Sequence, residues 1–223
     1  MTEVAISARK QLGGLIEGAG RRRWGWDGLP LATPQHHRAM RASAVMVLAR
    51  PIAGDVAFLL LRRSLTLRHH PGEFAFPGGG IDPEETPVTA AIRECREETG
   101  VVLDQGHVLG TLPALALEAS ANVVTPVLAW AGDARSHLAQ HRHDHETHST
   151  HWVPRSHLVD PENRTTVTYG DYWAGPGFLL DSGHIWGFTG SVLDWLLDEL
   201  EWSSPWDASR RHEIAEGVPR ELR

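Results

Sequence analysis

The sequence predicts an α/β protein, because short apolar segments that suit strands stand on both sides of one well-defined helix. Residues 42–48 and 56–61 are rich in Val, Ala and Leu, and Pro51 and Gly54 separate them as a turn would. Three consecutive glycines, 78–80, then precede the helix. These observations favour strands joined by tight turns, with helices packed against them.

The other elements follow in chain order from the same criteria. Residues 5–16 can form a short helix, which Trp24 and Trp26 can hold on the domain. Residues 186–201 carry apolar side chains at helical spacing, so we expect an amphipathic helix to close the domain. Five more segments have the composition of strands: 73–76, 108–112, 123–130, 152–159, which runs into a turn, and 178–180.

The length of 223 residues suits one large domain with additional segments at its ends. We expect an N-terminal arm packed on the domain at residues 1–38, the domain itself at 39–203, and a polar C-terminal tail at 204–223. The run Arg21–Arg23 in the arm is interpreted as a solvated basic turn, and the alternative is a phosphate-binding patch.

Composition narrows the class of protein further. Lys and Arg number 21 and Asp and Glu number 28, so the formal net charge of -7 argues against a nucleic-acid partner. The single cysteine, Cys95, excludes an internal disulfide and fits a reducing compartment. Neither a membrane span of roughly 18 apolar residues nor a signal-peptide segment stands out. We therefore expect a cytoplasmic protein without a membrane partner.

The clearest helix is predicted at residues 87–99. Thr86 is a good N-cap, Pro87 suits the first turn, and Gly100 can take the left-handed conformation that ends a helix. At about 100° per residue, one stripe of this helix should be buried. Its members are Val88, Ala91, Ile92, Cys95 and Thr99.

Glu94, Glu97 and Glu98 share the other side of this helix within an arc about 100° wide. Like charges at these spacings repel one another, and they repel more strongly in a cleft than in water. Arg93 can reach Glu97, but one guanidinium cannot neutralise three carboxylates. A hard divalent ion such as Mg2+ can, because it takes carboxylate and phosphate oxygens. The alternative, usual for an acidic helix taken alone, is a solvated charged face.

The spacing of these residues resembles a known motif. Gly79 is followed after five residues by Glu85, and after seven more by the segment RECREETGV, residues 93–101. This pattern resembles the Nudix box, G-x5-E-x7-R-E-U-x-E-E-x-G-U, where U is a bulky apolar residue; Cys95 is smaller than usual at its position. The resemblance implies a Nudix-type α/β/α sandwich, with a mixed curved sheet between helices, the box helix on one side and the C-terminal helix on the other.

The resemblance also implies a hydrolase that cleaves a diphosphate linked to another moiety, with Mg2+ or Mn2+ as the cofactor. Glu97 and Glu98 are then the expected metal ligands, and Glu94 is a further ligand or orients the attacking water. Gly79 matches the position near which the family often offers a backbone carbonyl to the metal. Two box residues are expected to brace the glutamates and the loop: Arg93 and Glu85.

Residues 59–79 resemble a second signature, L-L-T-x-R-S-x3-R-x3-G-x3-F-P-G-G, which marks the coenzyme A pyrophosphatase branch of the Nudix family. The departure is Leu61, where the branch usually has Thr. The implied reaction converts coenzyme A or acyl-CoA to 3',5'-ADP and 4'-phosphopantetheine or its acyl form. Cationic side chains here can bind several anionic oxygens, although a basic loop that covers the sheet edge is the alternative. The predicted substrate-binding residues are Arg63, Arg68, His69, His70 and Gly72.

Two other interpretations stay open. Leu61, and the lack of any sequence code for an adenine pocket, leave room for a Nudix hydrolase that acts on ADP-ribose, a dinucleotide or a nucleoside triphosphate. From a different class, the chain could be a catalytically silent Nudix module that binds a ligand. The intact glutamates argue against this second alternative.

The connection before residue 152 is polar and rich in histidine. Its histidines, within 137–151, match no standard structural zinc spacing and have no cysteine nearby, so we interpret them as exposed polar residues. Nudix enzymes often bring an extra acidic residue from a later loop, and Glu146 is therefore a candidate base or metal ligand. Nine tryptophans would suit a homodimer interface, although a monomer core explains them equally well.

Overall fold

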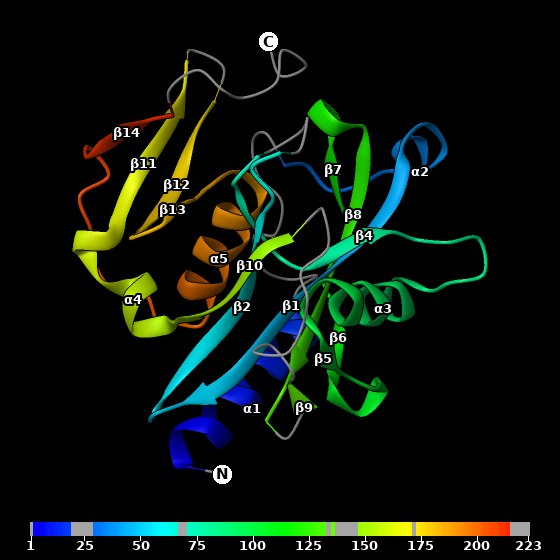
Figure 1. The fold of residues 1–223 in the computed structure, drawn as a ribbon, viewed down its shortest axis with the longest axis horizontal. Helices are drawn as coiled ribbons and strands as arrows, with labels where there is room; N and C mark the ends of the chain where they lie inside the picture. The colour runs from blue at the N-terminus through cyan, green and yellow to red at the C-terminus, as the bar shows by residue number, and fades with distance from the viewer. Residues whose placement is uncertain are drawn as a thin grey trace.

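The structure is a computed structural model that describes residues 2–18, 29–66, 71–132, 135–136, 147–170 and 173–214. Within these residues the strands form an eight-stranded sheet, a four-stranded sheet and a two-stranded pair (Figure 1). The large sheet contains β1 Arg41–Ile52, β2 Asp55–Arg63, β3 Phe74–Ala75, β4 Gly78–Gly80, β6 Val108–Thr111, β7 Leu115–Leu117, β8 Asn122–Trp130 and β10 Thr147–Pro154. The smaller sheets contain β11 Arg164–Tyr169, β12 Trp173–Leu180, β13 Gly183–Ile185 and β14 Arg211–Glu213, and the pair β5 Val101–Val102 with β9 Arg135–Ser136.

Helices connect and cover these sheets. The α-helices are α1 Glu3–Gly18, α2 Pro34–Ala39, α3 Pro87–Thr99, α4 Arg155–Val159 and α5 Gly187–Glu199. Three short 3-10 helices are η1 Gln105–His107, η2 Glu118–Ser120 and η3 Pro161–Asn163. No helix in the described part of the chain is long and apolar enough to cross a membrane.

Strand β1 is the central element of the large sheet, whose main order is β10-β2-β1-β8-β6. It pairs in parallel with β8 along residues 41–49, so the sheet is mixed. On its other side, its first half pairs with β4 and its second half pairs with β2, both antiparallel. The glycine turn and the β1–β2 hairpin are therefore attached to opposite ends of one strand.

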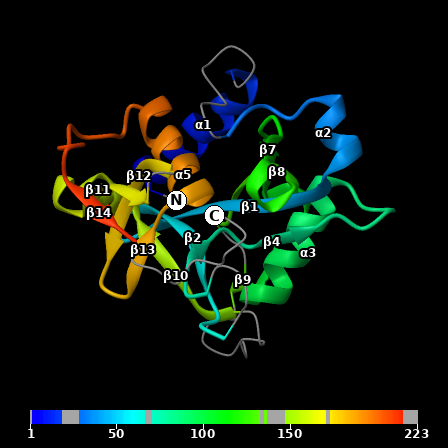
Figure 2. The same ribbon diagram turned by 90° about the horizontal axis from the view of Figure 1, so that it is seen from above.

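The large sheet separates two layers of helices, as Figure 2 shows: α3 lies on one side and α1 and α5 lie on the other. The alternation of side chains along β1 produces this division. Ala44, Met46 and Leu48 are buried with the apolar side of α3, whereas Val47 and Ala49 are buried with α1 and α5. The predicted α/β/α arrangement, with a mixed sheet between helices, is confirmed.

Helix α3 has the predicted bounds and the predicted caps. The Thr86 side chain accepts a hydrogen bond from the Thr89 backbone N–H, Pro87 begins the helix, and Gly100 is left-handed with φ 71°. Of the expected stripe, Ala91, Cys95 and Thr99 are buried, and Val88 and Ile92 are partly buried. Burial raises the pKa of the Cys95 thiol to about 12, so this side chain acts as a small neutral core residue.

The predicted strands are confirmed at the centre of the sheet and need correction near the C-terminus. The strand expected at 152–159 ends at Pro154, and residues 155–159 form helix α4 instead of a turn. The segment 178–180 belongs to the longer β12 and is not the last strand. Strands β11 and β14 are not among the predicted elements.

Helix α1 covers the expected short helix of residues 5–16 and extends it at both ends. It packs on the α5 side of the sheet through a buried stripe of Ala5, Ala8, Leu12 and Leu15. The predicted role of Trp24 and Trp26 lies outside the described residues. At the other end, residues 211–213 of the predicted polar tail form β14, which pairs with β11. The division of the chain at residues 38 and 203 stays a prediction.

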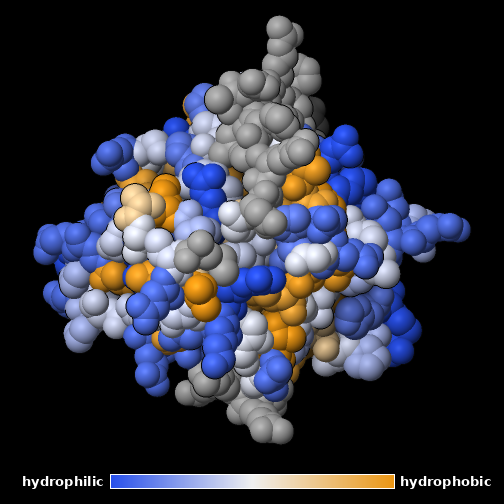
Figure 3. Space-filling model, turned by 90° about the horizontal axis from the view of Figure 1, so that it is seen from below, coloured by the Kyte–Doolittle hydropathy of each residue, from blue (hydrophilic) through white to orange (hydrophobic). Residues whose placement is uncertain are grey.

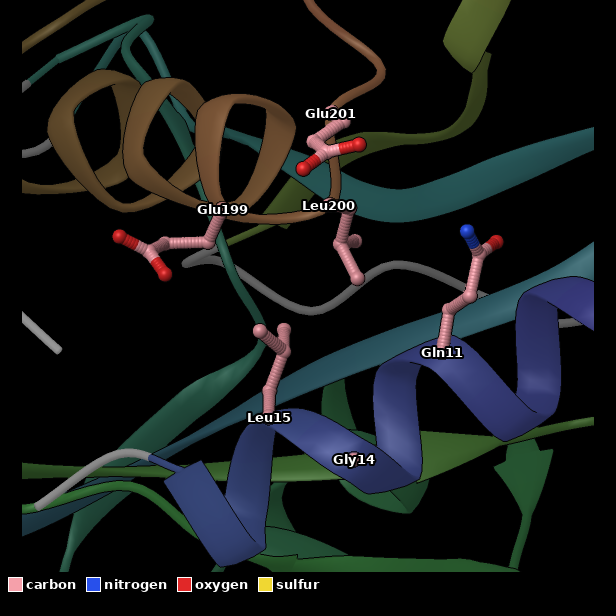
Figure 4. A pocket seen from close by; sticks show the side chains of 6 residues that line it. All are labelled: Gln11, Gly14, Leu15, Glu199, Leu200 and Glu201. Carbon is pink, nitrogen blue, oxygen red and sulfur yellow. The ribbon is translucent and has the colours of Figure 1, made fainter. Parts of the chain in front are cut away.

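A pocket lies between α1 and the end of α5 (Figure 4). Leu15 and Leu200 point toward each other across it, and the polar ends of Gln11, Glu199 and Glu201 lie beside them. This pocket is on the face of the sheet opposite to α3, so it is separate from the acidic side chains of that helix.

The surface seen in Figure 3 shows apolar patches that hydrophilic side chains separate from one another. The large apolar side chains that are exposed in the described residues are Val4, Ile6, Leu31, Leu65 and Val102. Val4 and Ile6 belong to α1, and the other three come from separate segments of the chain. The homodimer and the cytoplasmic location stay predictions.

Candidate active site

Glu98 lies between α3 and the glycine turn. Its side chain accepts a hydrogen bond from the Gly78 backbone N–H at 2.8 Å, and the residue is 7% exposed. Gly78 pairs with Val45, and the carbonyl of Pro77 accepts a hydrogen bond from the Met46 N–H. The central strand therefore fixes the turn, and the turn fixes the carboxylate of Glu98.

Arg93 connects the loop to the acidic face of α3. Its Nε and Nη2 donate to the two carboxylate oxygens of Glu85 at 2.8 and 2.9 Å, and Nη2 also donates to the Gly80 carbonyl at 3.0 Å. Its Nη1 donates to Glu94 at 2.7 Å and to Glu97 at 3.4 Å. This is the bracing role expected of Arg93 and Glu85, and the i+4 contact with Glu97 is present.

Glu85 and Arg93 shift each other's pKa. Hydrogen bonds from Arg93, and then the backbone N–H of Asp82, lower the pKa of Glu85 to about 2. The carboxylates of Glu85 and Glu94 raise the pKa of Arg93. Glu85 thus stays ionised at neutral pH, and Arg93 is shared between this carboxylate in the loop and Glu94 on α3.

Gly79 is in close contact with Glu94. A Cβ atom at position 79 would lie 2.6 Å from Glu94 Cδ, and ordinary contact begins at 3.4 Å. Glu94 is 17% exposed, whereas Glu97 is 58% exposed. The backbone of the turn and a carboxylate of α3 therefore meet at a point where any side chain larger than that of glycine would displace Glu94.

The donor chemistry of this cluster fits a divalent cation. Arg93 binds three carboxylates, those of Glu85, Glu94 and Glu97, and the carboxylate of Glu98 lies on the same helix, so negative charge is in excess. Within the described residues no three such side chains already form a metal cage, because Glu94 and Glu97 both turn to Arg93 Nη1. Arg93 keeps its bonds to Glu85 and Gly80 when Nη1 is released. Glu94 and Glu97 can therefore reorient toward a cation with little loss, and oxygen ligands suit Mg2+ or Mn2+.

The predicted substrate residues are described only in part. Arg63 ends β2 and, by alternation with buried Leu59, lies on the same face of the sheet as α3. Its Nε is buried and has no hydrogen-bond partner within the described ranges. Gly72 has φ +74°, and its carbonyl accepts a hydrogen bond from Arg62 Nε at 3.2 Å. Four predicted residues lie outside the described residues: Arg68, His69, His70 and Glu146.

Sequence reasoning missed two residues on this face, Arg50 and Trp152. The guanidinium carbon of Arg50 lies 4.1 Å from the centroid of the Trp152 ring. The signal that could have found Arg50 is alternation, because it continues the series of inward-facing positions Ala44, Met46 and Leu48 on β1. A charged residue in such a series indicates a side chain that faces a partly covered site.

Residues 40–170, more than half of the chain, match the NUDIX domain. The chain belongs to the Nudix family. The human protein named mitochondrial coenzyme A diphosphatase NUDT8 is 31% identical over 175 residues, which are 76% of this chain and 73% of that protein. This Nudix chain is thus a hydrolase of a family that generally uses divalent metal ions and acts on small nucleoside diphosphate compounds.

Other relatives match over shorter stretches. Nudix hydrolase 3 of Caenorhabditis elegans is 36% identical over 97 residues, which are 44% of this chain and 40% of that protein. The crystal structure of a MutT/nudix family protein from Enterococcus faecalis is 17% identical, with a TM-score of 0.47, over 79% of this chain and 61% of that one. The match to the Caenorhabditis elegans protein thus spans less than half of that protein's length.

Proposed function

We propose that this Nudix hydrolase cleaves the diphosphate of coenzyme A or acyl-CoA to give 3',5'-ADP and 4'-phosphopantetheine or its acyl form, with Mg2+ or Mn2+. The observation that carries the proposal is the position of Arg63. It belongs to the signature of the coenzyme A branch, and its buried Nε, on the α3 face of the sheet, has no hydrogen-bond partner in the described part of the chain. The similarity to human NUDT8, which is named as a coenzyme A diphosphatase, supports the same substrate.

The neighbours of Arg63 in the sheet also support a contact with the diphosphate. Leu61 on β2 pairs with Ala75, and the N–H of Arg63 donates to the carbonyl of Glu73, so Arg63 is beside the segment that leads into the glycine turn. Thr147, next to Glu146 in the chain, pairs with Arg63 from the other side. A cation beside the acidic cluster can hold phosphoryl oxygens.

The chain's own residues divide the chemical work. Glu94, Glu97 and Glu98 would hold the divalent cation, which when bound supplies charge neutralisation and an activated water. Glu98 is positioned by the Gly78 N–H, and Glu94 is positioned by contact with Gly79. Arg93 keeps the loop and the helix in register through Glu85 and Gly80. Glu146 remains the candidate base.

The test is a panel of substrates at equal concentration: coenzyme A, acetyl-CoA, ADP-ribose, a dinucleoside polyphosphate and a nucleoside triphosphate. We expect the highest kcat/KM with coenzyme A or acetyl-CoA, and 3',5'-ADP as a product. Glu98→Gln should remove most turnover while the thermal unfolding curve stays similar. Glu84→Gln is the matched control, because Glu84 is an exposed residue of the loop that precedes α3. This variant should behave as the unmodified protein.

A second candidate, a Nudix hydrolase that acts on another nucleoside diphosphate compound, is favoured by Leu61. This residue stands where the coenzyme A branch usually has Thr. Leucine has no hydroxyl to offer a substrate, and this side chain is only 2% exposed. Higher kcat/KM for ADP-ribose than for coenzyme A would support this candidate. If no member of the panel is hydrolysed in the presence of the metal, the chain is instead a silent binding module.

A further inference from the structure

The pair of Arg50 and Trp152 lies on the α3 face of the sheet, away from the acidic cluster. Arg50 Nε and Trp152 Nε1 are both buried, and neither has a hydrogen-bond partner among the residues that the structure describes. No carboxylate in the described part of the chain pairs with Arg50, and burial lowers its pKa without compensation from a neighbouring charge. A partly buried cation without a counter-ion is unfavourable unless something else supplies the negative charge.

The sheet directs Arg50 toward Trp152. Arg50 on β1 is paired with Ala57 on β2, and Ala57 is paired with Pro154 on β10. Because Ala57 has a small side chain, the Arg50 side chain can pass over β2 and reach the ring of Trp152 two strands away. Trp152 also packs against the apolar core beneath α3. The pair is therefore built into the same face as the glutamates.

The distance between this pair and the acidic cluster matches an extended ligand. Val45 is opposite Gly78, whose N–H holds Glu98, and Arg50 is five residues farther along the same strand. Five residues of β-strand span about 16 Å. A compound held at its diphosphate by the cluster and Arg63 can therefore reach Arg50 only with a group other than that diphosphate.

We propose that Arg50 and Trp152 form a subsite for an anionic group of the substrate other than the diphosphate. The proposal rests on the proposed function and specifies how the same site selects its substrate. Acyl-CoA compounds carry two such groups: the ribose 3'-phosphate, and the terminal carboxylate of a dicarboxylic acyl chain. Both present an oxyanion with several acceptor oxygens, which suits a guanidinium and an indole N–H.

The test compares two substrate pairs, each differing by one anionic group. Coenzyme A against dephospho-CoA tests the 3'-phosphate, and succinyl-CoA against butyryl-CoA tests the acyl carboxylate. For the unmodified protein we expect kcat/KM to favour the charged member of one pair. In Arg50→Gln this preference should fall by about 10- to 100-fold, the usual effect of losing a hydrogen bond to a charged group. Arg38→Gln, an exposed arginine of α2, should keep the preference.

A purely structural role for Arg50 gives a different result, because both members of each pair would lose kcat/KM equally. A fall in the first pair alone identifies the phosphate, and a fall in the second pair alone identifies the carboxylate. Unchanged ratios in both pairs overturn the subsite while leaving coenzyme A hydrolysis in place. If the unmodified protein hydrolyses no coenzyme A compound, the proposed function fails and the subsite fails with it.

Metal-free binding gives a second readout for the phosphate. We expect 3',5'-ADP to bind more tightly than 5'-AMP by calorimetry when the first pair responds, and Arg50→Gln should remove the difference. Trp152→Phe keeps an aromatic ring under Arg50 but removes the indole N–H, and it should reduce the same preference in part. If Arg50→Gln does not fold, Trp152→Phe decides, because an unchanged preference in a folded Trp152→Phe protein overturns the joint subsite.

Discussion

Replacement of Gly79 by alanine tests whether the turn positions Glu94 for catalysis. The new Cβ would lie 2.6 Å from Glu94 Cδ, so this carboxylate has to retreat by about 0.8 Å to reach ordinary contact at 3.4 Å. The clash falls on the end of a flexible side chain, and Gly79 does not have a positive φ. We therefore expect the free energy of unfolding to change by less than about 1 kcal/mol.

Activity should respond much more strongly than stability. A displacement of about 1 Å in a group that orients reactants can cost on the order of 100-fold in rate. Steady-state diphosphate hydrolysis should thus fall by roughly that factor, and the affinity for Mn2+, measured by calorimetry, should weaken about 10- to 100-fold. Urea unfolding without metal gives the stability on the same samples.

The neighbouring glycine is the matched control. A Cβ at Gly78 would lie 2.7 Å from Val45 Cα and 2.8 Å from its Cγ1, so the clash falls on the backbone of the central strand. Gly78→Ala should therefore destabilise the protein by about 3 kcal/mol and lower Tm by roughly 6 to 12 °C. If Gly79→Ala keeps full turnover, Glu94 has no positioned role, and if it unfolds like Gly78→Ala, the assigned contact is wrong.

Two further predictions concern ion pairs. Because the pKa of Glu85 is lowered to about 2, its pair with Arg93 stabilises the loop above the ordinary pKa near 4.5, and this stabilisation is lost as pH falls from about 4.5 to about 2. An NMR titration of the Glu85 carboxyl should show the low pKa, and Arg93→Gln should return it toward the ordinary value. Arg164→Met should cost about 3 to 5 kcal/mol at pH 7, because it leaves the largely buried Asp194 without its partner. Burial raises the pKa of Asp194, so this penalty should shrink as pH falls and Asp194 takes up a proton. Urea unfolding of the variant at pH 7 and pH 5 measures the change. An equal penalty at both pH values would show that Asp194 is solvated.

The sequence predicts α3 in detail because its signals are local. Thr86, Pro87 and Gly100 mark the ends of the helix within one turn, and helical spacing places the glutamates on one face. What these signals cannot give is the choice of partner for each charge. Arg93 makes its bidentate contact with Glu85 in the preceding loop, and Glu98 turns to a backbone N–H of the glycine turn.

The missed elements depend on contacts between distant parts of the chain. Strand β11 begins with Arg164, a residue type that is seldom buried, yet this side chain is 0% exposed between the rings of Phe178 and Trp206 and paired with Asp194. The strand that pairs with β11, β14, is polar and lies more than 40 residues away in the chain. Arg50 was missed for the same reason, because an arginine at the end of an apolar strand suggests a solvent-exposed position.

The alternation along β1 divides its side chains between the two faces of the sheet. Val47 and Ala49 pack with α1 and α5, whereas Met46 and Leu48 pack with the apolar side of α3. Arg50 lies on the same face as Met46 and Leu48 and contacts the ring of Trp152. Because the apolar side chains on both faces are fully buried, shortening either set leaves a cavity and lowers stability. Arg50, at the end of the series, is the residue of this face whose side chain can be changed without opening either core.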